Sequence, residues 1–365
     1  MHVVEGNPFF SIIVPCCNVE RYLGAMAASV KKQSFADWEC VLSVEDSTDG
    51  TLAACEALAK GDQRFRIVRG PRSGSPSTPR NRGLSVAEGR YVVWLDGDDW
   101  LADDALAKMA KRLLANGEPD ALQGSTTELL DDGKGGFTRV ARHYNFEPDD
   151  DGKILSGLQV TQRFADLPRF AMPMASLTVC RHDFLLAHAL QFVDGLRYED
   201  NEWTPRVFAF AERVLVMDAD VYVYRRRGGS ITTADSLLSM YGQRADMLWH
   251  LFRFFVAHDF PAAFYRVWAR RYVSFFFDQI FLDDLKEHRP GLAARDWTRC
   301  VRRVLSNGGR RAFLKLVRCA GLPKKLSAPL VLLCGIHPVL DVPARLYVRH
   351  VYYPLTMRRF KRRGW

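Results

Sequence analysis

Tyr91-Val92-Val93-Trp94-Leu95-Asp96-Gly97-Asp98-Asp99 is the stretch that decides the fold class of this chain. Its five apolar residues predict a buried strand, because a short run rich in β-branched and aromatic residues suits a sheet covered on both faces. Three carboxylates follow where that strand ends, which in an α/β protein is where ligands bind. Asp96 and Asp98, two positions apart on an extended chain, share one side of the backbone and suit a divalent cation that also holds phosphate oxygens. An isolated triplet of this kind is more often a solvated acidic turn, so the rest of the chain has to decide.

Predicted strands and helices alternate on both sides of this stretch. Before it, we expect strands at residues 9–14, 39–44 and 65–68, with Pro15 stopping the first, and helices at 19–32, 51–59 and 81–87. After it, we expect a helix at 105–115, strands at 121–125, 176–179 and 215–224, and a helix at 201–211. Residues 131–153, rich in Asp and Gly, predict an exposed hairpin or loop of the kind that carries binding specificity. The alternation predicts an α/β fold with a mostly parallel sheet flanked by helices.

The composition is that of a globular protein. With 365 residues, the chain is long enough for one large domain or two ordinary ones. Its eight cysteines form no C-x-x-C pair and no zinc-type spacing, which favours reduced thiols. The first residues lack the pattern of a signal peptide, and no stretch reaches the roughly 20 apolar residues of a spanning helix. We therefore expect a cytoplasmic protein.

The basic charge is concentrated at the C-terminal end. Residues 301–365 hold 15 Lys or Arg and one acid, so they carry +14, and since the whole chain carries +9 the other 300 residues carry −5. The chain turns helical and aromatic after Thr233, which predicts a boundary near residue 235 and a helical, basic region at 236–365. The tail suits an anionic membrane surface, although its apolar run at 326–333 is equally typical of a core helix. No nucleic acid is expected as a partner, because no binding module accompanies the charge.

Five stretches stand in the order and spacing of a known enzyme family. They lie at residues 11–20, 47–51, 80–84 ahead of 95–99, 195–200 and 222–232. Together they resemble the family 2 glycosyltransferases of bacterial surface-polysaccharide type, which are inverting enzymes with a GT-A fold. The resemblance implies a GT-A catalytic domain at 1–235, with a donor half at about 9–125 and an acceptor half at about 126–235, followed by the helical extension.

The resemblance gives the acidic stretch a role in binding a nucleotide-sugar donor. In this family a Mn²⁺ or Mg²⁺ ion bridges the donor diphosphate and stabilises the charge of the leaving group. Asp98 is then the direct metal ligand, and Asp96 reaches a metal-bound water or the ribose. Asp99 either supports these two or, as a first-turn acid, caps a helix that begins after Trp100.

The resemblance also names the catalytic base. Inversion by a single displacement needs a group that takes the proton of the acceptor hydroxyl, and Asp200 of the pair Glu199-Asp200 has that role. Glu199 then helps to position the acceptor or the base. Outside this context, the pair would be two ordinary acids at a helix N-terminus.

The remaining donor-site residues follow from the same resemblance. They are Pro15, Cys17, Glu20, Glu45, Ser47, Arg80, Asn81, Asp96, Gly97, Arg227 and Ser230. Arg80 and Asn81 are equally typical of a surface turn, and of the three successive arginines at 225–227 at most two can point the same way on a strand. Two positions depart from the family pattern: Val44 stands where an aspartate contacts uracil, so Glu45 is expected to reach the base instead, and Cys17 stands where an aromatic often lines the nucleoside pocket.

The sequence therefore predicts an inverting, metal-assisted glycosyltransferase that moves a sugar, most simply from a UDP-sugar, to a glycan or lipid-linked acceptor. It is expected on the cytoplasmic face of a membrane, held by the basic tail. One alternative is a nucleotidyltransferase or other phosphate-processing metal enzyme, which would need a second ligand set or a nucleophilic aspartate after the first strand. Another is a membrane-associated scaffold with a decayed donor site, which only the Val44 and Cys17 departures favour.

Overall fold

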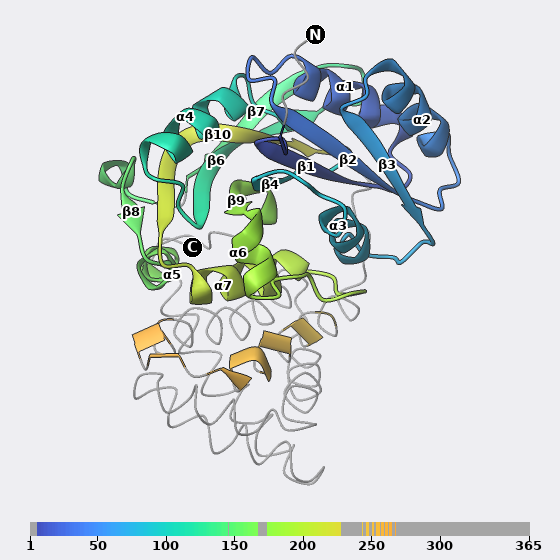
Figure 1. Cartoon of the computed structure of the whole chain (residues 1–365). Coiled ribbons are helices and arrows are strands. Elements are labelled where there is room, and N and C mark those ends of the chain that lie inside the picture. Colours follow the sequence, from blue (N-terminus) through green and yellow to red (C-terminus); the bar gives the residue numbers. More distant parts are fainter. Residues whose placement is uncertain are drawn as a thin grey trace, which may run out of the picture. The chain divides into compact units, whose positions relative to one another are not determined.

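The computed structural model describes residues 6–144, 146–166 and 174–227, together with single positions between 243 and 267. The chain divides into two compact units, Met1–Thr233 and Ala234–Trp365. The helices and strands described in full belong to the first unit (Figure 1). Ser230, the basic tail at 301–365 and most of the region predicted to be helical at 236–365 lie outside the described residues. Among the described residues, no helix is long and apolar enough to cross a membrane.

A 10-stranded mixed sheet forms the centre of the first unit. Four parallel strands are neighbours in the order β3 (Phe65–Gly70), β2 (Trp38–Glu45), β1 (Phe10–Cys16) and β4 (Tyr91–Trp94). The antiparallel strand β9 (Thr178–Arg181) joins β4 to β6 (Ala121–Asp131), and β6 pairs in parallel with β10 (Val214–Arg226). The short strands β5 (Trp100–Leu101) and β8 (Ile154–Leu155) pair with β10, and β7 (Phe137–His143) pairs with β6. The expected α/β fold is confirmed, with β9 inserted against the direction of its neighbours.

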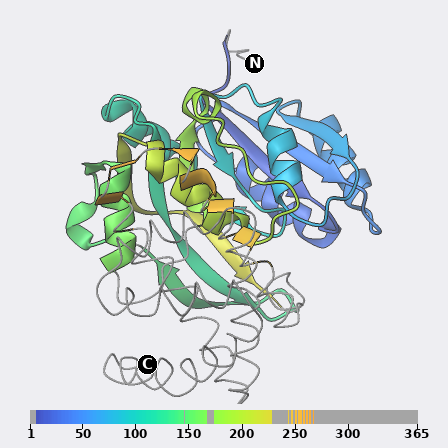
Figure 2. The ribbon, with the colours of Figure 1, turned by 90° about the horizontal axis from the view of Figure 1, so that it is seen from below.

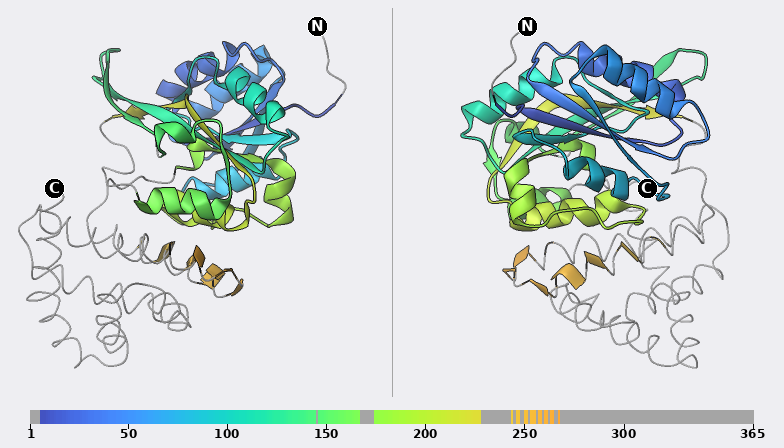
Figure 3. Two further views of the ribbon diagram at one scale, coloured as in Figure 1. Left: turned by 90° about the vertical axis from the view of Figure 1, so that its left-hand side faces the viewer. Right: turned by 45° about the vertical axis from the view of Figure 1, so that its right-hand side comes forward.

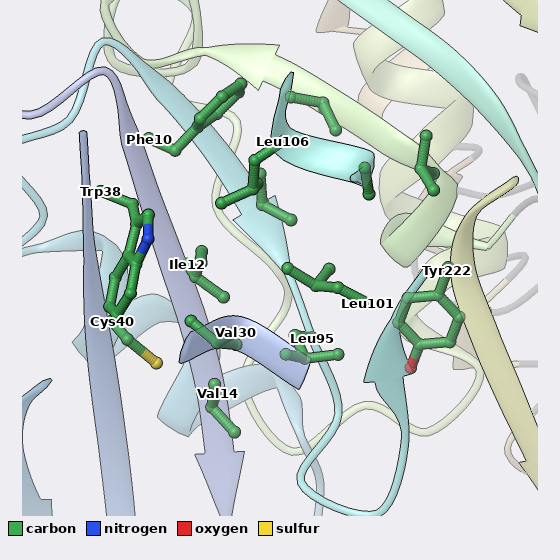
Figure 4. Packing of buried hydrophobic residues seen from close by; sticks show 14 of the residues in the cluster. Phe10, Ile12, Val14, Val30, Trp38, Cys40, Leu95, Leu101, Leu106 and Tyr222 are labelled. Atoms are coloured by element: carbon green, nitrogen blue, oxygen red, sulfur yellow. The ribbon is translucent and has the colours of Figure 1, made fainter. Parts of the chain in front are cut away.

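Helices cover both faces of the sheet, and each face has its own apolar core. One face carries α1 (Glu20–Lys31), α2 (Thr51–Gly61) and α4 (Ala105–Ala115), and the other carries α3 (Ser77–Leu84), α5 (Gly157–Asp166), α6 (His182–Ala187) and α7 (Glu199–Phe210) (Figures 1 and 2). Strand β1 is apolar except for Ser11, because its side chains enter the two cores alternately, Ile12 and Val14 one of them and Ile13 the other. Figure 4 shows Ile12 and Val14 among the side chains of the first core.

The parallel direction of the strands brings the loops that follow them to one edge of the sheet. Since β1, β2 and β4 run in the same direction, their carboxyl ends meet at one edge of the sheet, and the loops that follow them gather there. The ends of these strands and the segments directly after them carry most of the residues predicted to bind the donor.

For the Asp- and Gly-rich segment we expected a hairpin or a loop, and the structure shows a hairpin. Strand β6 runs on to Asp131, well past the predicted end at 125, and turns back into β7. The hairpin reaches beyond the neighbouring strands (Figure 3). Every residue of β7 except Ala141 is exposed, and the strand pairs with β6 along one edge.

Two predicted element boundaries were wrong for identifiable reasons. Strand β1 does not stop at Pro15: Ile13 accepts the last hydrogen bond on the β4 side, and Pro15 turns its nitrogen to that side, where pairing has already ended. Helix α3 occupies Ser77–Leu84 rather than 81–87, because a proline such as Pro79 is tolerated in a first turn, where the N–H has no partner within the helix.

Candidate functional site

The acidic stretch forms a tight turn between β4 and β5. The N–H of Asp99 donates to the carbonyl of Asp96 at 3.1 Å, so the carboxylates do not continue the strand. The expectation that Asp96 and Asp98 share one side of a strand is therefore wrong. Within the turn the Asp96 carboxylate meets Arg80 and the Asp98 carboxylate meets Arg227.

Arg80 joins the acidic turn to the start of helix α7. Its Nη2 donates to Asp96 at 2.7 Å, and its Nη1 donates to Glu199 at 2.7 Å and to Asp200 at 3.2 Å. The guanidinium is buried and lies 5.2 Å from the centre of the Phe192 ring. The structure thus brings the predicted base and a predicted donor-binding aspartate together around one cation, although they are more than a hundred positions apart in sequence.

Glu199 and Asp200 form the first turn of α7, as predicted. Burial, together with the neighbouring charge of Glu199, raises the pKa of Asp200 to about 7, although Arg80 opposes the shift. Burial also raises the pKa of Glu199. Tyr198, just before the helix, has a φ of 59°, a left-handed conformation that costs energy for a bulky residue and is often found at functional sites. A carboxyl group with a pKa near neutrality is suited to act as a general base.

Asp99 fixes the acidic turn to β10. The Tyr222 hydroxyl and the N–H of Arg225, the latter at 2.7 Å, both donate to its buried carboxylate. Burial and the surrounding carboxylates raise the pKa of Tyr222, so the hydroxyl keeps the proton that it donates. The alternative of a helix cap is wrong, because β5 and not a helix follows Asp99.

Asp98 is bound by Arg227, the residue that directly follows β10. Arg227 donates to Oδ2 of Asp98 from Nε at 3.0 Å and from Nη2 at 2.7 Å, and its guanidinium lies 4.6 Å from the Tyr22 ring centre. Arg225 also lies over Tyr22, whereas Arg226, between them, pairs with Glu128 at 3.5 Å. Two of the three arginines therefore point the same way, as the strand geometry predicts.

Hydrogen bonds join the loops after β1 and β2 at the edge of the sheet where the donor is predicted to bind. Asn18, with a φ of 55°, accepts from the Thr48 N–H at 2.8 Å, and its own N–H donates to Ser47 at 3.2 Å. The carboxylate of Glu20 accepts from the Gly50 N–H at 2.8 Å. Ser47 and Glu20, predicted in the donor site, therefore have structural contacts here.

Three more predicted residues lie close by. Cys17 is half-buried, and its thiol donates to the Asp46 carbonyl at 3.8 Å. Burial raises the pKa of this thiol, which favours its neutral form. Pro15 and Gly97 approach each other: a Cβ at Gly97 would lie 3.2 Å from the Pro15 carbonyl oxygen, so the turn fits most easily around a glycine.

Glu45 and Asn81 are occupied by other loops. Ser73 donates to the buried Glu45 carboxylate from its hydroxyl at 2.7 Å and from its N–H at 3.3 Å, and Val44 beside it is buried in the core. Asn81 donates to the Phe192 carbonyl and accepts from the Phe192 N–H, both at 2.8 Å. Glu45 thus fixes the loop after β3, and Asn81 fixes the segment before α7.

The acidic turn fits a metal ion that takes its other ligands from a substrate. Among the residues that the structure describes, no three His, Cys, Asp or Glu side chains are grouped as a complete metal site. Burial and, after it, the charge of Asp96 raise the pKa of Asp98, although Arg227 opposes the shift. Mg²⁺ at phosphate-transferring sites binds through one or two carboxylates, substrate phosphates and water. Asp98 and Asp96 can supply these one or two carboxylate ligands.

Sequence reasoning assigned no role to Tyr222, Tyr22 or Phe192, which hold the charged side chains of the site. Tyr222 lay within a recognised stretch, but its contact with Asp99 spans 123 positions. Tyr22 and Phe192 look like ordinary core residues in the sequence. No local pattern distinguishes such residues, because their partners are set by the packing of distant elements.

Comparison with known proteins relates the chain to glycosyltransferases. Residues 11–158 match the family model described as Glycosyl transferase family 2. "Glycosyltransferase GlyG" of Streptococcus pneumoniae is 25% identical over 236 residues, which cover 64% of this chain and 76% of that protein. The Escherichia coli "UDP-Glc:alpha-D-GlcNAc-diphosphoundecaprenol beta-1,3-glucosyltransferase WfgD" is 33% identical over 107 residues, which cover 29% of this chain and 42% of that protein. Residues 1–349 of S. aureus TarS, solved in complex with UDP-GlcNAc, share the fold with a TM-score of 0.63 at 20% identity, covering 94% of this chain and 91% of that one.

The sheet is of the GT-A type that TarS shares, and the family match and the related glycosyltransferases make this class of protein a nucleotide-sugar-dependent glycosyltransferase. The family match places a family 2 glycosyltransferase domain at residues 11–158 of the chain. Neither a phosphate-processing enzyme of another class nor a scaffold agrees with this assignment.

Proposed function

We propose that this chain transfers a sugar from a UDP-sugar to an acceptor hydroxyl with inversion at the anomeric carbon. One observation carries the proposal: a single buried arginine, Arg80, contacts both Asp96 of the acidic turn and the Glu199-Asp200 pair. The reaction needs one carboxylate group on the donor side and a base on the acceptor side, and these lie on either side of Arg80. The uridine donors named for WfgD and TarS support the choice of UDP.

Asp200 is the proposed base. It accepts the proton of the acceptor hydroxyl while the acceptor oxygen bonds to the anomeric carbon and the bond from that carbon to the diphosphate oxygen breaks. The electron pair of the broken bond leaves with UDP, and the product has the inverted configuration. Its raised pKa suits this role, because a base with a pKa near the working pH combines adequate ionisation with adequate strength.

Asp98, with Asp96, is proposed to hold a Mn²⁺ or Mg²⁺ ion, which when bound offsets the negative charge on the leaving diphosphate. Asp98 is the better direct ligand, because its partner Arg227 is only one partly exposed side chain, whereas Asp96 is bound to the buried Arg80. Arg227, once it releases Asp98, is placed to pair with the diphosphate, with Ser230 beyond it in the chain.

The donor nucleoside is proposed to bind along the loops after β1 and β2. Pro15, Cys17, Glu20, Glu45, Ser47 and Gly97 remain the proposed lining or support of this pocket. Because the Glu45 carboxylate is engaged by Ser73, its contribution to base recognition would come through the loop that it fixes.

The proposed acceptor is a glycan or a lipid-linked intermediate of bacterial surface-polysaccharide synthesis. The diphosphoundecaprenol-linked acceptor in the name of WfgD supports the lipid-linked form. The proposed location is the cytoplasmic face of a membrane, with residues 301–365 as the contact, since this segment carries a net +14. Flotation of the full chain with anionic but not with zwitterionic vesicles would support the contact, and equal flotation with both would contradict it.

The function is tested by UDP release from UDP-Glc, UDP-GlcNAc and UDP-Gal in the presence of Mn²⁺. We expect turnover of at least one donor, and thermal stabilisation by UDP with Mn²⁺ that Asp98→Ala abolishes. Asp200→Asn should retain that stabilisation and lose about 10²- to 10⁴-fold in turnover, the usual contribution of a general base. Asp183→Asn, which changes another first-turn acid at a helix start, is the matched control and should keep turnover. Metal-independent binding of every nucleotide tested, or full turnover by Asp200→Asn, would overturn the assignment.

A further inference from the structure

Arg80 lies behind the carboxylates that it binds. Its side chain is 3% exposed, whereas those of Asp96, Glu199 and Asp200 are 32%, 11% and 24% exposed. The three carboxylates come from the acidic turn and from α7, and the arginine comes from α3. The acids therefore line the accessible side of the site, and the guanidinium connects them from the interior.

We propose that Arg80 is a positioning residue that holds the base Asp200 and the donor-side Asp96 in one fixed arrangement, and that it does not bind the donor diphosphate. The inference rests on the proposed function, since it assigns Arg80 a part in the same reaction. It replaces the sequence-based expectation that Arg80 borders the diphosphate.

The geometry favours this role over diphosphate binding. A diphosphate that approached the Arg80 guanidinium would meet Glu199 and Asp200, which belong to no proposed metal site, and charges of the same sign repel each other. Arg80 would also have to leave contacts of 2.7 Å to Asp96 and to Glu199 in a buried environment, where a carboxylate without its partner is costly. Arg227 is 21% exposed and contacts the carboxylate of Asp98, so a diphosphate could bind its guanidinium without breaking a fully buried ion pair.

The chemistry of the guanidinium explains why an arginine stands here. Its planar fork donates in fixed directions, so one side chain can hold carboxylates from two elements at set positions. A lysine offers a single ammonium and cannot reproduce that geometry. The charge of Arg80 also lowers the pKa of Asp200 against the effects of burial, of Glu199 and of Asp96, which keeps part of the base ionised near neutrality.

The test is Arg80→Lys, which keeps the positive charge, assayed for UDP release from the donor that the wild type uses best. We expect kcat to fall about 10- to 100-fold, because a displacement of the base by about 1 Å can cost 10²-fold. The dissociation constant of UDP with Mn²⁺, measured by calorimetry, should change less than about threefold, since the charge beside Asp96 remains. Arg163→Lys is the matched control: Arg163 binds the buried Asp150 with two hydrogen bonds of 2.8 and 3.0 Å, outside the site, and its replacement should leave kcat unchanged.

A second measurement shows through which residue Arg80 acts. In an Asp200→Asn background, Arg80→Lys should lower the residual turnover by less than about threefold, because a positioning effect vanishes when the positioned base is absent. An equal loss in both backgrounds would overturn the proposal, as would a loss of UDP affinity of tenfold or more in Arg80→Lys, which would identify Arg80 as a diphosphate ligand. These outcomes differ from a failure of the proposed function, in which the wild type itself would release no UDP. The calorimetric comparison of UDP affinity decides the role of Arg80 even in that case.

Discussion

The acidic turn contacts two arginines, and the two arginine–carboxylate groups differ in burial and in the number of carboxylates that they contain. Arg80 is 3% exposed and contacts three carboxylates from two elements. Arg227 is 21% exposed, contacts one acid among the described residues, Asp98, and lies over the ring of Tyr22. The first group is part of the protein interior, and the second lies at its edge.

The difference indicates which carboxylate is free to change partners. Breaking a buried ion pair leaves an uncompensated charge in a poorly solvated place, whereas a partly exposed pair contributes little because water compensates its loss. Asp96 and Asp200 are therefore fixed, and Asp98 can exchange Arg227 for another cation. A transferase needs both properties, a base that does not move and a cation site that fills when the donor arrives.

The largest effect that separates the two groups is on stability. Arg80→Met should reduce the free energy of unfolding by about 3–5 kcal/mol, because it leaves Asp96, Glu199 and Asp200 without their shared partner. Arg227→Met should cost less than about 1 kcal/mol. Urea unfolding followed by tryptophan fluorescence measures both. Similar losses in the two variants would remove the distinction between a fixed and an exchangeable group.

Tyr222 tests whether the turn between the two groups is rigid. Tyr222→Phe removes the hydroxyl that donates to the buried Asp99 and should cost about 2–3 kcal/mol, because hydrogen bonds to charged groups contribute more than those to neutral groups. Tyr91→Phe, which removes a hydroxyl bonded to the Pro119 carbonyl at 2.8 Å, is the matched control and should cost about 1 kcal/mol. If both variants lose the same amount by thermal unfolding, Asp99 does not depend on Tyr222, and the turn is not anchored as described.

The contrast between the two arginines was only partly predictable from the sequence. The strands, the helices and the identity of the acidic residues followed from local patterns, since apolar runs and turn residues act over a few positions. The position of Asp200 at a helix start also followed. The partners of Arg80 did not, because its contacts with Glu199 and Asp200 span 119 and 120 positions and depend on how α3 packs beside α7.

The acidic turn shows why the strand geometry expected for Asp96 and Asp98 was wrong. A period of two holds only while the chain stays extended, and the chain leaves the strand at Leu95. Asp96 and Asp98 consequently lie in a turn, where they contact different arginines, and not side by side along a strand. Glu45 and Asn81 illustrate the same limit, since each is polar, lies beside the site and is engaged by a neighbouring loop.

The pH dependence of turnover tests the fixed group. Asp200 acts when ionised, and since burial and Glu199 raise its pKa to about 7, kcat/KM at saturating Mn²⁺ should rise about tenfold per pH unit below 7 and level off above it. The same shift means that the folded state holds this proton more tightly than the unfolded chain, so it lowers stability as the pH rises from about 4 to 7. A profile that is already flat from pH 5 upward would show that the base is not in this environment. The residual turnover of Asp200→Asn should lack the rising limb.

The smallest effect concerns the exchangeable group. Arg227→Gln removes the guanidinium that competes for Asp98, so Mn²⁺ should bind the nucleotide-free protein about two- to fivefold more tightly, which corresponds to the 0.4–1 kcal/mol of a partly exposed pair. Arg226→Gln is the control, because that neighbouring side chain is 60% exposed and pairs with Glu128 on the other side of the strand. Calorimetric titration with Mn²⁺ alone measures both. UDP affinity in the presence of Mn²⁺ should change in the opposite direction and weaken in Arg227→Gln, because the arginine released from Asp98 is then missing from the diphosphate. Unchanged Mn²⁺ affinity would mean that Arg227 and the ion do not compete for Asp98. Arg80 and Arg227 would then differ in burial, and not in whether the carboxylates that they bind can exchange partners.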